Sequence, residues 1–161
     1  MKLAVLLLVV APFGAMAEER SLRLEGGETL AYQTVEAESE SARSVAVQFL
    51  KLLAAANIDA AARLSNAPQR RRAVLHDYYE AVGDAEFRRI FAEYAVQRII
   101  AEIAIGERRL LVRDLGDADH HLAGQYFVRT PSGFLIDDLP GEERSRLTRV
   151  LSAYRAGRIT P

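Results

Sequence analysis

Two adjacent aspartates near the end of the chain, Asp137 and Asp138, are the carboxylates best placed for acid–base chemistry. They follow an alternating apolar segment, and alternation places Asp138 on the same face as Phe134 and Ile136. An isomerase-type site requires a carboxylate in an apolar cavity beside a hydroxyl donor. Four tyrosines predicted to point inward supply hydroxyls: Tyr78, Tyr79, Tyr94 and Tyr126. Asp138 is therefore the one candidate for a catalytic base.

Ordinary structural roles explain these residues more simply. An aspartate at a strand end commonly caps backbone groups or pairs with arginine. Tyrosines at helical spacing commonly belong to the core, with a satisfied hydroxyl. We therefore expect no catalytic residue, and we keep an enzyme that uses Asp138 as an alternative.

The three histidines do not form a metal-binding pattern. His120 and His121 are adjacent on an expected strand edge, so their side chains would point to opposite faces. His76 and Glu80 could share a helix face, but zinc takes three or four ligands and no third partner is evident. The chain has no cysteine, which excludes thiolate sites. We predict no metal and no cofactor.

The longest basic run consists of Arg70, Arg71 and Arg72. On a helix these side chains fan out about 100° apart, so solvated faces are the simplest interpretation. An anion pocket assembled from several arginines stays open as an alternative. Serine nucleophile elbows, phosphate-binding glycine loops and dinucleotide fingerprints are absent from the sequence. The net charge of -1 gives no electrostatic reason to expect a nucleic-acid partner.

The first seventeen residues have the three-part pattern of a secretory signal peptide. Lys2 precedes an apolar run over 3–11, and residues 15–17 form a small-x-small cleavage site. The apolar run is shorter than the ~20 residues that span a bilayer, so we expect no retained membrane anchor. We predict that cleavage before Glu18 leaves residues 18–161 as a single periplasmic domain. The signal peptide, the expected lack of an anchor and the Arg-rich composition together predict a Gram-negative source.

The rest of the sequence divides into a hairpin, a helical half and a strand-rich half. Alternating residues on both sides of Gly26 and Gly27 predict a short β-hairpin. Apolar residues at helical spacing predict helices over 45–56, 59–64, 74–82, 87–94 and 147–154. Period-two alternation predicts strands over 99–105, 110–112, 121–129 and 134–139. The order, with helices first and an antiparallel meander second, predicts an α+β class.

The connection between the first two helices contains residues with strong local preferences. Asn57 is expected to end the first helix, because asparagine adopts the left-handed conformation readily. Asp59 is expected to be the N-cap of the second helix.

The run from Phe49 to Ala61 resembles the opening helices of the nuclear transport factor 2-like superfamily, which includes ketosteroid-isomerase-like proteins. The segment from Gly124 to Val128, its turn and the run from Phe134 to Asp138 are similar to the final hairpin of that superfamily. The resemblance covers roughly Ser44 to Leu139. It implies that the N-terminal helices pack on a curved antiparallel sheet, which forms a cone that often encloses a pocket. The N-terminal hairpin, a helix near Phe87 and the C-terminal helix are additions that could cover the mouth of the cone. Members include enzymes, binding proteins and assembly domains, so the fold does not select a function.

The leading hypothesis is an exported, non-enzymatic domain that binds a small apolar or anionic ligand, or a protein partner, through the concave sheet. Five residues are expected to line the site: Ile103, Tyr126 and Asp138 from the sheet, and Tyr78 and Tyr94 from the helices. A second hypothesis is an envelope-assembly module that forms a homodimer through the open sheet face. A third is an isomerase- or dehydratase-like enzyme with Asp138 as base and a tyrosine as donor.

Overall fold

The computed structural model describes residues 17–35, 41–116 and 121–160. The predicted signal peptide lies outside the described residues except for Ala17, and so does His120. Within the described part, every helix is too short or too polar to cross a bilayer.

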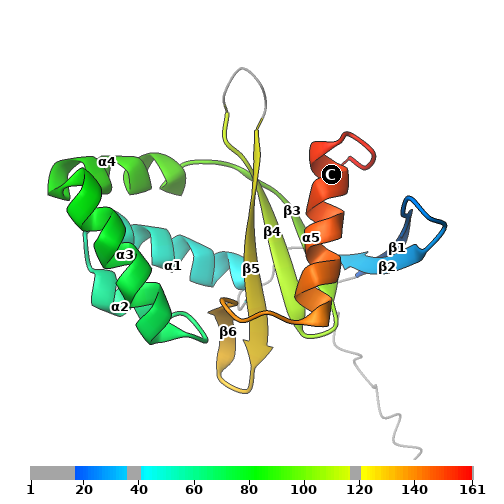
Figure 1. Cartoon of the computed structure of the whole chain (residues 1–161), viewed down its shortest axis with the longest axis horizontal. Coiled ribbons are helices and arrows are strands. Elements are labelled where there is room, and N and C mark those ends of the chain that lie inside the picture. The colour runs from blue at the N-terminus through cyan, green and yellow to red at the C-terminus, as the bar shows by residue number, and fades with distance from the viewer. Residues whose placement is uncertain (1–16, 36–40, 117–120, 161) are drawn as a thin grey trace, which may run out of the picture.

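The structure confirms the predicted α+β class, with the N-terminal hairpin and the C-terminal helix (Figure 1). The five helices are α1 (Ala42–Ala54), α2 (Ile58–Ala62), α3 (Pro68–Val82), α4 (Asp84–Ala95) and α5 (Glu142–Arg155). The six strands are β1 (Glu18–Arg23), β2 (Thr29–Thr34), β3 (Ile99–Ile105), β4 (Arg108–Asp114), β5 (Leu122–Thr130) and β6 (Gly133–Ile136).

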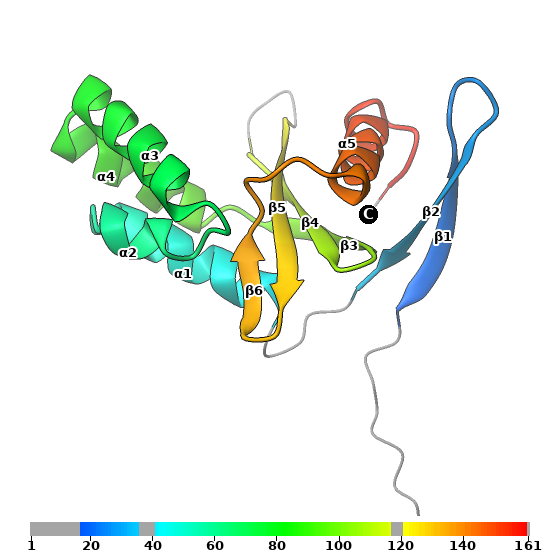
Figure 2. The ribbon, with the colours of Figure 1, turned by 60° about the horizontal axis from the view of Figure 1, so that its bottom comes forward.

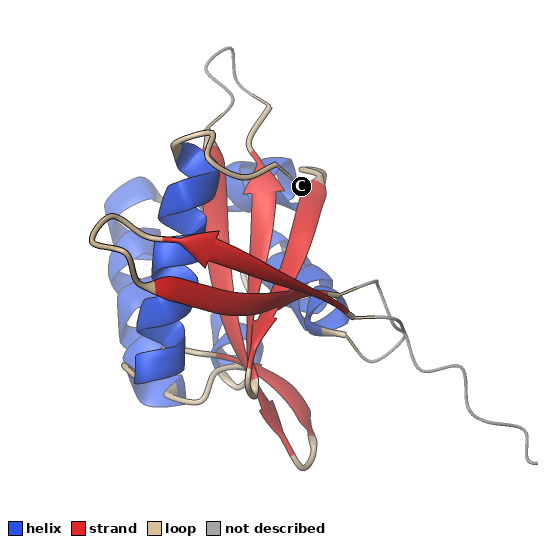
Figure 3. Cartoon of the chain, turned by 90° about the vertical axis from the view of Figure 1, so that its right-hand side faces the viewer, coloured by secondary structure: helices blue, strands red, loops and turns tan. Residues whose placement is uncertain are grey.

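The strands form one open antiparallel sheet in the order β1-β2-β3-β4-β5-β6, so each strand pairs with its neighbours in sequence. Gly26 and Gly27 both have positive φ in the turn between β1 and β2, a conformation that favours glycine. Only two residue pairs join β2 to β3. The hairpin accordingly runs across the direction of β3, β4 and β5, as Figure 3 shows.

Helices cover both faces of the central strands (Figure 2). Alternation along β4 divides its side chains, because Leu110 and Val112 pack with α5 whereas Leu111 packs with the N-terminal helices. The first core contains Leu147 and Leu151 of α5 together with residues of β1 to β4. The sheet is therefore the middle layer between α5 and a layer formed by α1 to α4.

The N-terminal helical layer is built on α1. Phe49 and Leu53 are buried, as the apolar period predicts, and Phe87 of α4 is fully buried in the same core. The predicted stripe on α3 is only partly internal, because Leu75 is buried whereas Val74 and Tyr78 are 55% and 37% exposed. One side of α3 therefore faces outward.

The predicted roles of Asn57 and Asp59 are wrong in detail. The left-handed residue after α1 is Ala56, with φ of 54°. Asn57 is instead the N-cap of α2, where its side chain accepts a hydrogen bond from the backbone N–H of Ala60 at 3.3 Å. Asp59 lies in the first turn of α2, where its carboxylate favours the helix dipole.

Candidate functional site

The five predicted ligand-binding residues do not line one cavity. Ile103 is fully buried in the core between the sheet and α5. Tyr126 lies on the same face, where its hydroxyl is 3.0 Å from the hydroxyl of Thr148 on α5. Tyr78 and Tyr94 belong to the helical layer on the opposite face. Ile103 and Tyr126 thus share one face of the sheet, and α5 covers that face.

Asp138 lies just beyond β6, and its carboxylate is held by two other side chains. It accepts hydrogen bonds from the hydroxyl of Ser65 and from two nitrogens of Arg71 on α3. Both donors come from the helical layer, since Arg71 lies on α3 and Ser65 lies between α2 and α3. Neither donor is a tyrosine, so this geometry is that of an ion pair that joins β6 to α3.

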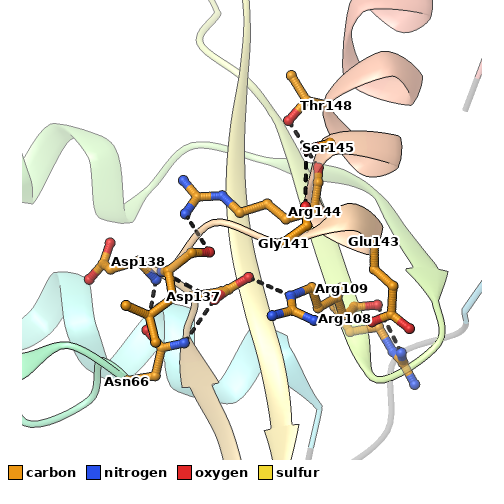
Figure 4. Close-up of polar contacts among 11 residues, drawn as sticks. Asn66, Arg108, Arg109, Asp137, Asp138, Gly141, Glu143, Arg144, Ser145 and Thr148 are labelled. Atoms are coloured by element: carbon orange, nitrogen blue, oxygen red, sulfur yellow. Dashed lines mark hydrogen bonds and ion pairs between the residues drawn. The ribbon is translucent and has the colours of Figure 1, made fainter.

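Asp137 is the more deeply buried of the two aspartates, with a fully buried side chain. Its carboxylate lies 2.9 Å from Nε of Arg108, and it accepts a hydrogen bond from the amide of Asn66 at 2.8 Å (Figure 4). Arg108 also forms an ion pair with Glu143 of α5 at 3.2 Å. Asp137 therefore connects the end of the sheet to both helical layers.

A small apolar pocket lies between α1, α4 and the sheet, and Tyr94 lines it. Its volume is about 180 Å³. Leu50 of α1 and Phe91 of α4 form apolar walls, and residues 123–125 of β5 and Arg113 of β4 form the sheet side. Tyr78 lies behind this wall, with its ring centroid 6.2 Å from that of Phe91. We call this cavity the Arg113 pocket.

Arg113 is the only charged residue among those that line this pocket. The residue is 5% exposed, and its Nη1 donates to the backbone oxygen of Gln97 at 3.2 Å. Its Nη2 is buried and has no hydrogen-bond partner among the described residues. No carboxylate of the described part lies within ion-pair distance of it, and burial lowers the pKa of its guanidinium.

An unpaired guanidinium in an apolar environment is costly, because burial removes its hydration and no anion replaces it. The side-chain oxygen of Gln97 is likewise buried without a donor among the described residues. Natural proteins satisfy most buried polar groups, so each exception requires an explanation. A carboxylate bound in the pocket would supply the missing acceptor for Arg113.

The sequence offers two histidine groups as candidate metal ligands, His76 with Glu80 and His120 with His121, and predicts no metal site. Nε2 of His76 lies 4.0 Å from the carboxylate of Asp59. Within the described ranges, no three His, Asp or Glu side chains gather as a metal site.

Arg113 was missed at the sequence level, although a signal for it exists. It ends the run Leu110, Leu111, Val112, in which apolar residues occupy both faces of the strand. Such a run is typical of a strand covered on both sides, so the next charged residue is expected to be buried.

The chain matches no protein-family model, no curated protein and no solved structure. The resemblance to the nuclear transport factor 2-like superfamily therefore stays a prediction.

Proposed function

We propose that the protein is a non-enzymatic binding protein for a small monocarboxylate with an apolar or aromatic body, held in the Arg113 pocket. The observation that carries this proposal is the buried guanidinium of Arg113, whose Nη2 lacks an acceptor among the described residues. An apolar wall beside one cation fits a ligand that has an apolar body and one negative charge.

The size of the pocket limits the ligand. Its volume of about 180 Å³ is close to the ~150 Å³ of an apolar cavity that accepts benzene. A benzoate-sized acid or a short fatty acid therefore fits, whereas a steroid does not. The rings of Phe91 and Tyr94 would contact the apolar body, and side-chain rotation of Arg113 would turn Nη2 to the carboxylate.

Benzoate and benzamide form a matched pair of probes, because they share a shape and differ in charge. Benzoate is expected to raise the thermal midpoint of residues 18–161 more than benzamide at the same concentration. Arg113→Met is expected to weaken benzoate binding about tenfold or more, since hydrogen bonds to charged groups contribute ~1.5–3 kcal/mol. Arg89→Met removes a surface arginine of α4 that pairs with Glu86, and it should leave benzoate binding unchanged.

Two results would contradict the proposal. One is an equal effect of benzoate and benzamide on the wild-type protein, which would make the guanidinium irrelevant. The other is unchanged benzoate binding in Arg113→Met. Ala123→Leu tests the cavity separately, because it fills the pocket from β5 and keeps the arginine; it should abolish binding of both probes.

We further propose export to the periplasm, supported by the charged start, apolar run and cleavage pattern of residues 1–17. Expression of the full chain in a Gram-negative host is expected to give a periplasmic protein that begins at Glu18. N-terminal sequencing of the periplasmic fraction measures this start directly. An uncleaved chain in the cytoplasm would contradict export.

A further inference from the structure

A second, larger cleft lies between α3 and α5, on a different part of the molecule from the Arg113 pocket. Its volume is about 500 Å³. Arg70 and Arg71 line it from α3, Arg144 and Thr148 line it from α5, and Asp138 lies between them. Three guanidinium groups and a single carboxylate therefore surround one cavity.

The carboxylate in the cleft is neutralised by one of these arginines. Arg71 donates from Nε and Nη2 to the two oxygens of Asp138, and Ser65 donates to the same carboxylate. This two-point pair has the geometry in which arginine binds a carboxylate most strongly. The Asp138 carboxylate therefore does not neutralise the positive charges of Arg70 and Arg144.

Arg70 and Arg144 both donate hydrogen bonds to the loop that connects β6 to α5. Nη1 of Arg70 lies 3.3 Å from the backbone oxygen of Asp138, and Nη1 of Arg144 lies 3.1 Å from the backbone oxygen of Leu139. Figure 4 shows Arg144 reaching over this loop from α5. Backbone oxygens carry no net charge, so these contacts orient the two arginines without neutralising them.

Tyr126 fixes Arg144 further. The guanidinium carbon of Arg144 lies 5.0 Å from the centroid of the Tyr126 ring, within the range of a cation–π contact. The hydroxyl of the same tyrosine lies 3.0 Å from that of Thr148, which holds the ring against α5. Arg144 is thus preorganised before any ligand arrives.

Several other surface arginines form ion pairs with carboxylates. Arg72 pairs with Asp59, Arg88 pairs with Asp84, and Arg149 pairs with Glu28. Among the described residues, no carboxylate lies within ion-pair distance of Arg70 or Arg144. The cleft therefore combines two uncompensated positive charges with an open cavity.

We propose that the cleft between α3 and α5 binds a phosphate monoester, with Arg70 and Arg144 as the two residues that contact the phosphate. A phosphate monoester carries a charge of about −1.5 to −2 near pH 7, which matches the two guanidinium charges that no carboxylate neutralises. Planar guanidinium groups donate in pairs to phosphate oxygens. The cavity is larger than a phosphate ion, and Val74 and Pro140 give it an apolar side for an organic group.

Titration of residues 18–161 with phenyl phosphate, followed by calorimetry and by amide chemical shifts, tests this proposal. We expect binding with chemical-shift changes at residues 138–145. Arg70→Gln and Arg144→Gln should each weaken the affinity about tenfold or more. The matched control is Arg72→Gln, which removes a neighbouring arginine of α3 that pairs with Asp59 outside the cleft, and should leave the affinity unchanged.

A fallback variant and a second ligand keep the test decisive. Arg70 is exposed, so Arg70→Gln should fold normally even if Arg144→Gln does not. Inorganic phosphate distinguishes a phosphate monoester from free phosphate as the ligand. If it binds more weakly than phenyl phosphate, the apolar side of the cleft contacts an organic group. If it binds equally well, the site is one for free phosphate. Absence of binding to both probes overturns the proposal. An equal loss of affinity in all three arginine variants also overturns it, because that result indicates non-specific attraction.

Discussion

The carboxylate of Asp137 lies 2.9 Å from Nε of Arg108, and this ion pair joins the segment after β6 to the start of β4. Arg108 extends the connection to α5 through its second ion pair, with Glu143 in the first turn of that helix. The Asp137 side chain is fully buried, and a hydrogen bond to Asn66 extends the network to the segment before α3. Segments that are distant in sequence are therefore joined by one network around the Asp137–Arg108 pair.

Removal of this carboxylate is expected to destabilise the fold strongly. Asp137→Ala should lower the free energy of unfolding by about 3 kcal/mol, because it leaves a partly buried guanidinium without its main partner. Glu93→Ala removes one member of an exposed ion pair of α4 and should cost less than ~1 kcal/mol. Urea denaturation measures both values. Equal losses would show that burial of Asp137 does not matter.

Gly124 allows α5 to pack closely on β5. A methyl group at this position would overlap a side-chain carbon of Leu151 and lie 3.0 Å from one of Leu110. Both leucines are buried, so they have little freedom to move. Gly124→Ala is expected to lower the free energy of unfolding by about 1–3 kcal/mol.

A double-mutant cycle with Leu151→Ala checks the reason for this loss. Leu151→Ala alone should cost about 2–5 kcal/mol, because it opens a cavity. Combined with Gly124→Ala, it should cost less than the sum, since the added methyl group occupies the vacated space. Strict additivity would show that the two side chains do not compete.

The sequence predicted which residues share a face better than it predicted what covers that face. Alternation in β3 and β5 grouped Ile103 with Tyr126, and both side chains contact the core between the sheet and α5. Alternation could not show that α5 packs on this face, because that depends on where a helix from the far end of the chain returns. Two residues expected in a pocket therefore lie under α5 or beside it.

The local preferences of single residues also predicted helix ends and candidate sites incompletely. Asn57 caps α2 and Ala56 takes the left-handed conformation. The backbone N–H groups of Ala56 and Asn57 donate to carbonyl oxygens at the end of α1, and this pattern requires the turn at Ala56. The charge of Arg113 is typical of a surface residue, and only the covering of both sheet faces buries it. Arg70 was recognised as part of a basic run, but its approach to Arg144 depends on the packing of α3 near α5.

The hydroxyl of Tyr154 predicts a pH dependence of stability. Tyr154 is 4% exposed, and its hydroxyl is buried with no hydrogen-bond partner among the described residues. Burial raises the pKa of this hydroxyl in the folded state, the nearby Tyr32 raises it further, and Arg20 lowers it. The protonated form is therefore favoured in the native protein.

The direction of the effect follows from proton linkage. Below about pH 10, the ordinary pKa of tyrosine, both states keep the proton and this group gives no pH dependence. Above that pH, the unfolded chain loses the proton first, so the free energy of unfolding falls as pH rises. Tyr154→Phe should remove this part of the alkaline loss. At neutral pH the variant should be at least as stable as the wild type, because it removes an unsatisfied buried hydroxyl. Urea denaturation of both proteins between pH 8 and pH 11 measures the difference, and parallel stability curves would show that Tyr154 ionises equally easily in both states.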